Sequence, residues 1–224
     1  MKSLFLALVL VFVTFSCGLT ATVGPEVAVM QIKIGKERDL QQVVIGLYDD
    51  AAPATVANFK ELCRKRFYNG MRFHRAFPST LVQTGDPRSR RGPEDRSGTG
   101  GPGYTIPAEL GRGHVRGAVA MARLPDNINP SKVSNGSQFY VCLTPLPKLD
   151  GKYTVFGEVL EGLDVLDSIS NQPTDSNDFP LAKIVIKSIT IQPRFAEAPA
   201  QSLHGLLCET KRRVGTEVAK RGGL

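Results

Sequence analysis

One arginine lies within the short, largely apolar segment 73–78. Burying the guanidinium of Arg75 there would be costly unless the side chain had a partner or a chemical task. A guanidinium remains charged at physiological pH and presents several N–H donors in one plane. Arg75 is therefore the first candidate for a functional role, as a donor of hydrogen bonds.

The other side chains with catalytic chemistry favour structural roles. His114 comes just ahead of an expected strand, which predicts capping or packing, and the dipeptide Asp49-Asp50 is typical of a turn. Cys63 and Cys142 fall in helix-like and strand-like stretches, where cysteine acts as a small core residue. The sequence matches no zinc, haem or phosphate-loop pattern.

The composition is that of one globular domain with short terminal additions. The 224 residues are 42% hydrophobic and 22% charged, with a formal net charge of +7. Such a charge could favour nucleic acid or an anionic membrane as a partner. The lysines and arginines, however, are scattered or lie near the ends of the chain. We therefore expect no nucleic-acid partner.

The N-terminal segment has the features of an export signal. Lys2 precedes an apolar run over residues 4–15, which is too short for a comfortable membrane span but suits a signal-peptide core. Residues 1–21 are the predicted signal, ending at Leu19-Thr20-Ala21. The alternatives are a lipoprotein site with an acylated Cys17 and a retained membrane anchor. We expect an exported protein, periplasmic or secreted, that meets a membrane only through this segment.

The first elements of the expected domain are a hairpin and a helix. Residues 27–34 alternate in character and residues 42–48 form a second apolar run, so the pair predicts two antiparallel strands. Pro53 suits the first turn of a helix. The buried face of that helix is marked by residues three or four apart: Val56, Phe59, Leu62 and Cys63.

Short strands dominate the rest of the domain. They are expected at 72–75, 81–84, 118–122, 138–142, 153–158 and 184–191, with a second short helix around 163–169. Eight strands and two helices predict a mainly β fold, a closed antiparallel eight-stranded barrel with two capping helices. We assign this domain to residues 22–194. Residues 195–224 are rich in Ala, Gly, Lys and Arg and predict a basic tail, partly helical or disordered.

Six groups of residues resemble the motifs of the cyclophilin family, in family order. They are Phe73-His74-Arg75, Gln83-Thr84-Gly85-Asp86, Gly98-Thr99-Gly100-Gly101, Met121-Ala122, Asn135-Gly136-Ser137-Gln138-Phe139-Tyr140 and Leu149-Asp150-Gly151-Lys152-Tyr153-Thr154-Val155-Phe156-Gly157. The likeness extends over roughly residues 26–192, and segment 101–109 resembles the bacterial branch. One such motif would be weak support, whereas six in order over one domain are strong.

The resemblance implies a peptidyl-prolyl cis-trans isomerase that acts on proline-containing polypeptides and assists protein folding, without a cofactor or a covalent intermediate. By resemblance, Arg75 and Gln83 are catalytic. The implied substrate-binding residues are Phe77, Leu81, Ala122, Arg123, Gln138, Tyr140, Leu149 and Tyr153. His74 is expected to be structural, because isomerisation needs no proton transfer. We expect a monomer.

The chain departs from the family pattern inside the expected groove. Thr80 and Tyr140 stand where the family commonly has phenylalanine, and Lys148 where many members have a tryptophan associated with cyclosporin binding. The added Tyr140 hydroxyl must find a partner. These departures keep a second hypothesis open, a catalytically weak proline-peptide binding module or chaperone on the same barrel. An unrelated carbohydrate- or nucleic-acid-binding barrel would need an aromatic stacking platform, and the chain has no Trp.

Overall fold

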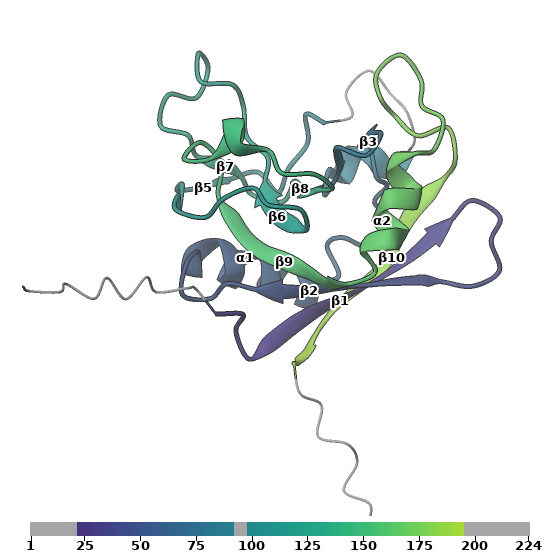
Figure 1. Ribbon diagram of the computed structural model, residues 1–224, viewed down its shortest axis with the longest axis horizontal. Helices are drawn as coiled ribbons and strands as arrows, with labels where there is room; N and C mark the ends of the chain where they lie inside the picture. The colour runs from purple at the N-terminus through teal and green to yellow at the C-terminus, as the bar shows by residue number, and fades with distance from the viewer. Residues whose placement is uncertain (1–21, 92–97, 195–224) are drawn as a thin grey trace, which may run out of the picture.

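The structure is a computed structural model that describes residues 22–91 and 98–194 (Figure 1). The predicted signal peptide, with Cys17, and the predicted tail lie outside the described residues. Within the described ranges, no helix is both long and apolar enough to cross a membrane.

One sheet of eight strands makes up most of the described fold, in the order β10-β1-β2-β9-β6-β8-β4-β3, with all neighbours antiparallel. The strands are β1 (Glu26–Ile34), β2 (Gln41–Leu47), β3 (Arg75–Phe77), β4 (Leu81–Thr84), β6 (Ala118–Met121), β8 (Phe139–Cys142), β9 (Val155–Glu161) and β10 (Ile184–Pro193). A second sheet pairs β5 (Thr105–Ile106) with β7 (Ser134–Asn135). The predicted mainly β fold is confirmed, whereas β5 and β7 are too short to leave a periodic signal.

The prediction of a closed barrel is wrong, because no ladder joins β3 to β10 in the part of the chain that the structure describes. β3 has only three residues, and its Ala76 N–H donates to the carbonyl oxygen of Asp178 at 2.9 Å. An isolated bridge from Arg72 to Val185 is the contact that reaches β10 from just before β3. The sheet is therefore a strongly curled, open half-barrel (Figure 1).

The predicted strand at 72–75 is wrong in its bounds, since β3 begins at Arg75. Two different partners meet this part of the chain. Arg72 bridges to β10, whereas Arg75 pairs with Gln83 of β4. A run of apolar residues indicates extended chain, but it does not show where the pairing partner changes.

Two helices cover the core, as predicted. α1 (Pro53–Arg64) packs against β10, and α2 (Leu163–Ser170) packs against β2, β3 and β4; Figure 1 shows them at opposite sides of the curled sheet. Phe59 of α1 lies among three aromatic rings, whose centroids are 5.2 to 5.6 Å away: Tyr68, Phe139 and Phe156. These contacts hold α1 on β8 and β9.

Alternation along the strands gives the sheet two faces. On β8, Phe139 and Val141 belong to the main core, whereas Tyr140 and Cys142 lie in a second cluster on the opposite face. Successive side chains of a strand point to opposite faces, and β6 alternates in the same way. Cys63 and Cys142 are buried in the core, as predicted, and burial raises the pKa of Cys142 to about 12. The second face holds the candidate site.

Candidate active site

The register of three strands aligns the main candidate residues in one row. Cross-strand pairing sets Arg75 opposite Gln83, Gln83 opposite Tyr140, and Tyr140 opposite Ala120. Residues directly opposite each other on antiparallel strands project on the same face of the sheet. β3, β4 and β8 therefore present Arg75, Gln83 and Tyr140 side by side, although they are distant in sequence.

A cavity of about 770 Å³, here called the main cavity, opens beside this row. Its lining includes eight of the ten expected site residues: Arg75, Leu81, Gln83, Ala122, Arg123, Tyr140, Leu149 and Tyr153. One part is apolar and aromatic, and another carries the guanidinium and amide of the row. Such a cavity suits an apolar ring attached to a polar peptide group.

The guanidinium of Arg75 is accessible, since 49% of its side chain is exposed. Its central carbon lies 4.5 Å from the centroid of the Phe77 ring, and its Nε lies 3.7 Å from Asp178 Oδ2. Arg75 and Phe77 are two residues apart on β3, which places both side chains on one face. Phe77 thus supports the guanidinium and lies outside the lining of the main cavity.

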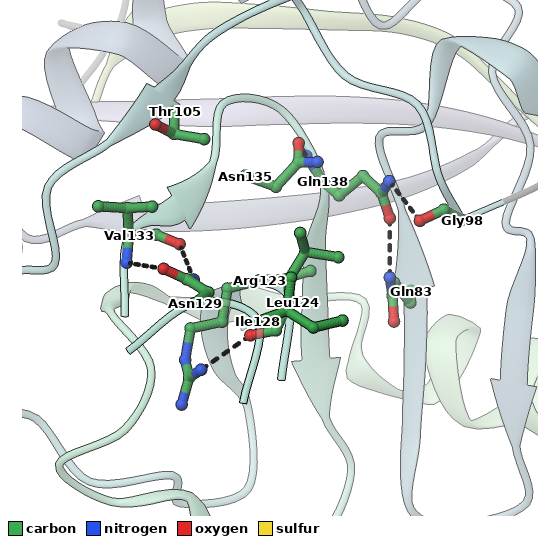
Figure 2. A pocket seen from close by; sticks show the side chains of 11 residues that line it. Gln83, Gly98, Thr105, Arg123, Leu124, Ile128, Asn129, Val133, Asn135 and Gln138 are labelled. Atoms are coloured by element: carbon green, nitrogen blue, oxygen red, sulfur yellow. Dashed lines mark hydrogen bonds between the residues drawn. The ribbon is translucent and has the colours of Figure 1, made fainter. Parts of the chain in front are cut away.

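Gln83 is oriented by a chain of hydrogen bonds (Figure 2). Its Nε2 donates to Gln138 Oε1 at 2.9 Å, and Gln138 Nε2 donates to the carbonyl oxygens of Gly98 and Gly100 at 2.9 and 2.7 Å. These two carbonyl groups fix the orientation of the Gln138 amide, so Gln83 is the donor between the two amides. Within residues 22–91 and 98–194, the Oε1 of Gln83 remains available to accept from another donor. Gln138 itself lines a neighbouring cavity of about 290 Å³.

Arg123 is almost fully covered, with 2% of its side chain exposed, and the protein itself satisfies its guanidinium. It donates to the carbonyl oxygens of Lys152 and Leu124 at 2.7 and 2.8 Å and to Asp126 Oδ1 at 2.5 Å. The hydrogen bond from Arg123 lowers the pKa of Asp126. The guanidinium carbon also lies 4.5 Å from the centroid of the Tyr153 ring. Arg123 therefore shapes the cavity wall, whereas the guanidinium of Arg75 is accessible from solvent.

Similarity to known proteins identifies the family of this chain. A family model described as "Cyclophilin type peptidyl-prolyl cis-trans isomerase/CLD" matches residues 29–191. The chain belongs to the cyclophilin-type peptidyl-prolyl cis-trans isomerases. It is 41% identical over 136 residues to peptidyl-prolyl cis-trans isomerase B of Bacillus subtilis, covering 59% of this chain and 86% of that protein. The predicted isomerase function is confirmed.

Two further cyclophilin-type proteins match 69% and 74% of this chain. The peptidyl-prolyl cis-trans isomerase-like 2 of Gibberella zeae is 36% identical over 163 residues, which cover 69% of this chain but only 26% of that longer protein. A crystal structure of a cyclophilin-type isomerase from Cryptosporidium parvum, in the presence of the dipeptide Ala-Pro, has a TM-score of 0.62 at 26% identity. It covers 74% of this chain and 98% of the other. The cyclophilin fold expected from the motifs is present.

The sequence reasoning missed one wall of this cyclophilin's main cavity. Ser176, Asn177 and Asp178, from the loop after α2, line it. Asp175 shapes the loop, because its Oδ1 accepts from the main-chain N–H groups of Asn177 and Phe179 at 2.8 and 2.9 Å. The signal in the sequence was a run of polar, turn-forming residues, which does not reveal the surface that a loop will reach.

His74 lines the main cavity of the cyclophilin but is only 4% exposed. Among the described residues, its ring has only weak polar contacts, with the side chain of Gln138 and the main chain of Arg72. Burial disfavours the imidazolium form and lowers the pKa of His74 to about 4. The imidazole is therefore neutral at pH 7, which agrees with the structural role expected for it.

We expect His74 to make this cyclophilin sensitive to acid. The His74 pKa is about 4 when folded and 6.5 for a free imidazole, so the unfolded chain binds a proton first as the pH falls. This residue should lower the free energy of unfolding by about 3 kcal/mol between pH 7 and pH 4. Denaturant unfolding at both pH values measures the drop. In His74→Gln the drop should be smaller by that amount, and an equal drop in both proteins would contradict the assignment.

Proposed function

We propose that Arg75 and Gln83 catalyse rotation about X–Pro bonds of polypeptides bound in the main cavity. The observation that carries this proposal is the row across β3, β4 and β8, which sets a half-exposed guanidinium beside an oriented amide and an aromatic wall. These groups line the same cavity, part of which is apolar. The arrangement offers donors to a peptide group and a surface to a proline ring.

The reaction suits a fixed guanidinium. Resonance in the peptide bond gives X–Pro rotation a barrier of about 18–20 kcal/mol. In the twisted state the resonance is lost and the prolyl nitrogen regains a lone pair, so a donor directed at that nitrogen stabilises the transition state more than the ground state. Arg75 supplies this donor, and Gln83 orients the guanidinium or the substrate carbonyl group. No bond is broken, so the step needs neither a nucleophile nor proton transfer.

The apolar part of the main cavity receives the proline ring. Leu81 and Leu149 are half-buried members of the cluster around Tyr140, and Ala122 and Tyr153 complete that surface. A proline ring that covers these side chains removes their apolar area from water, which stabilises the complex. The related Cryptosporidium structure, in the presence of the dipeptide Ala-Pro, supports this class of ligand.

A second candidate function is a catalytically weak binding module or chaperone. Two departures from the family pattern favour it. Thr80 and Lys148 have no aromatic ring to add to the cavity wall. The Thr80 Oγ1 donates to the carbonyl oxygen of Pro78 at 3.0 Å, and Lys148 is exposed in the short helix η2 (Pro147–Leu149). Such a module would bind the same proline peptides without accelerating their isomerisation.

A glutamine pair tests the proposed function. We expect the protein to accelerate cis-to-trans conversion of an X–Pro test peptide, and Gln83→Leu to lower kcat/KM about tenfold, which corresponds to about 1.4 kcal/mol of transition-state stabilisation. Gln192→Leu is the matched control, because Gln192 is exposed on β10, outside both cavities. Equal activity of the two variants would remove Gln83 from the mechanism. Peptide binding without acceleration by the unmodified protein would select the binding module.

The finer expectations about branch and location belong to the same proposal. We place the chain in a bacterial-like branch, which its 41% identity with the Bacillus protein supports. Residues 1–21 act as an export signal, because a lysine precedes a short apolar run. After removal of the signal, the mature protein is a monomer that is periplasmic or secreted. The alternative outcome is acylation of Cys17.

A further inference from the structure

The hydroxyl of Tyr140 has a buried partner that the isomerisation step does not use. Tyr140 lines the main cavity and is 5% exposed, and its oxygen lies 2.9 Å from His114 Nε2. The His114 side chain is completely covered, and its Nδ1 lies 2.8 Å from Asp150 Oδ1. These three residues form a chain of hydrogen bonds, here called the Asp150–His114–Tyr140 chain, that leads from solvent to the cavity wall.

The chemistry of the partners fixes the direction of each hydrogen bond. Hydrogen bonds from the main-chain N–H and the ring of His114 lower the pKa of Asp150, which is therefore an ionised acceptor. Because the His114 Nδ1 faces this carboxylate oxygen, it must carry a proton, and the tautomer with its single ring proton there leaves Nε2 as an acceptor. Burial raises the pKa of Tyr140, so its hydroxyl keeps its proton and donates a hydrogen bond to Nε2. In this arrangement, the carboxylate of Asp150, both ring nitrogens of His114 and the hydroxyl of Tyr140 each have a hydrogen-bond partner.

His114 also holds the segment that carries Leu149, another residue of the cavity lining. Its carbonyl oxygen accepts from the N–H of Leu146 at 2.8 Å, and its own N–H donates to Asp150 Oδ1 at 2.8 Å. Leu149, which lines the cavity, lies between these two attachments. His114 thus connects the strand that carries Tyr140 with the segment that carries Leu149, through its ring on one side and its main chain on the other.

We propose that His114 and Asp150 are positioning residues of the isomerase site, which hold the Tyr140 ring as a fixed wall for the proline ring. This inference rests on the proposed function. The Tyr140 ring is further limited by Tyr153, whose centroid is 5.9 Å away in an edge-on contact. If the His114 ring were absent, the buried hydroxyl would lose its acceptor, and the ring would have to turn toward the cavity to find another. A turned ring would occupy the space that the substrate needs.

A double-mutant cycle of His114→Leu and Tyr140→Phe tests the coupling. We expect His114→Leu to lower kcat/KM for a proline peptide about tenfold, mainly through KM, and Tyr140→Phe to lower it about twofold. Phenylalanine needs no acceptor, so the double variant should return to within about threefold of Tyr140→Phe. Two effects that multiply in the double variant would overturn the inference.

Three further measurements keep the test independent of turnover and of folding. First, the same cycle is measured on the dissociation constant of the proline peptide, which does not require turnover. If the unmodified protein does not accelerate isomerisation, the proposed function is refuted, and the peptide affinities still test the coupling of His114 with Tyr140. Nitrogen-15 shifts of the His114 ring should show Nδ1 protonated in the intact protein, and a proton on Nε2 would overturn the inference.

Asp150→Ala should weaken peptide binding several-fold even if His114→Leu does not fold. Asp150→Asn should restore most of the binding, because the amide oxygen still accepts from Nδ1. Equal binding by all three proteins would also overturn the inference.

Discussion

Replacing Arg75 by alanine is expected to lower kcat/KM for an X–Pro test peptide about 10²–10³-fold, the usual loss when one directed donor is removed from a transition state. The guanidinium is half exposed, stacked on the Phe77 ring and only 3.7 Å from a carboxylate oxygen of Asp178. It contributes little to burial, so the free energy of unfolding should stay within about 0.5 kcal/mol of the original value. The prediction is therefore a loss of activity in a stable protein.

Two variants sharpen the Arg75 experiment. Arg75→Lys keeps the charge but loses the planar set of donors, so we expect it to recover less than tenfold over alanine. Arg64→Ala is the matched control, because Arg64 is also an exposed arginine with a carboxylate nearby but lies on α1, away from the cavity. Activity of Arg75→Ala within threefold of the unmodified protein would remove this arginine from the mechanism.

Gly85→Ala is expected to destabilise the protein by about 3–5 kcal/mol, since backbone strain and a steric clash add together. Gly85 has a φ of +89°, and a methyl group there would lie 2.3 Å from the carbonyl oxygen of Ser137 and 2.9 Å from Gln138 Cα. Both contacts are with backbone, which cannot move aside without shifting Gln138. Denaturant unfolding measures the loss, and the oriented amide of Gln83 should be disturbed with it.

Gly103→Ala separates strain from clash. Gly103 has a similar φ of +94°, but an added methyl group would meet nothing within 4 Å. Strain alone should cost about 1–2 kcal/mol, so Gly85→Ala should exceed Gly103→Ala by at least about 2 kcal/mol. Equal losses would show that the close approach of Gly85 to the Ser137 backbone is not a constraint.

Local pattern was enough to predict most strands and both helices, but not their pairing. Alternation along β1 and the spacing of apolar residues in α1 depend only on neighbouring positions. The end of the pairing with β10 at Arg72, and the open edge of β3, depend on contacts with distant parts of the chain. For this reason the closed barrel and the strand 72–75 were mispredicted, although the mainly β class was right.

The candidate site shows the same division. Family motifs pointed to Arg75, Gln83 and the apolar residues of the main cavity, and the register of β3, β4 and β8 brings these together. The loop that contributes Asp178 carries no motif, and its position follows from hydrogen bonds to Asp175 and to β3. The need of the Tyr140 hydroxyl for a partner could be foreseen, whereas the identity of that partner, His114, required the fold.

The most direct test of the account is the rate of cis–trans exchange in an X–Pro peptide, measured by NMR at equilibrium with a small amount of protein. A catalyst that lowers the rotation barrier must accelerate exchange in both directions and leave the cis and trans populations unchanged. We predict this result for the unmodified protein, and exchange close to the uncatalysed rate for Arg75→Ala at equal peptide occupancy. Peptide bound in the main cavity with no faster exchange would contradict the account.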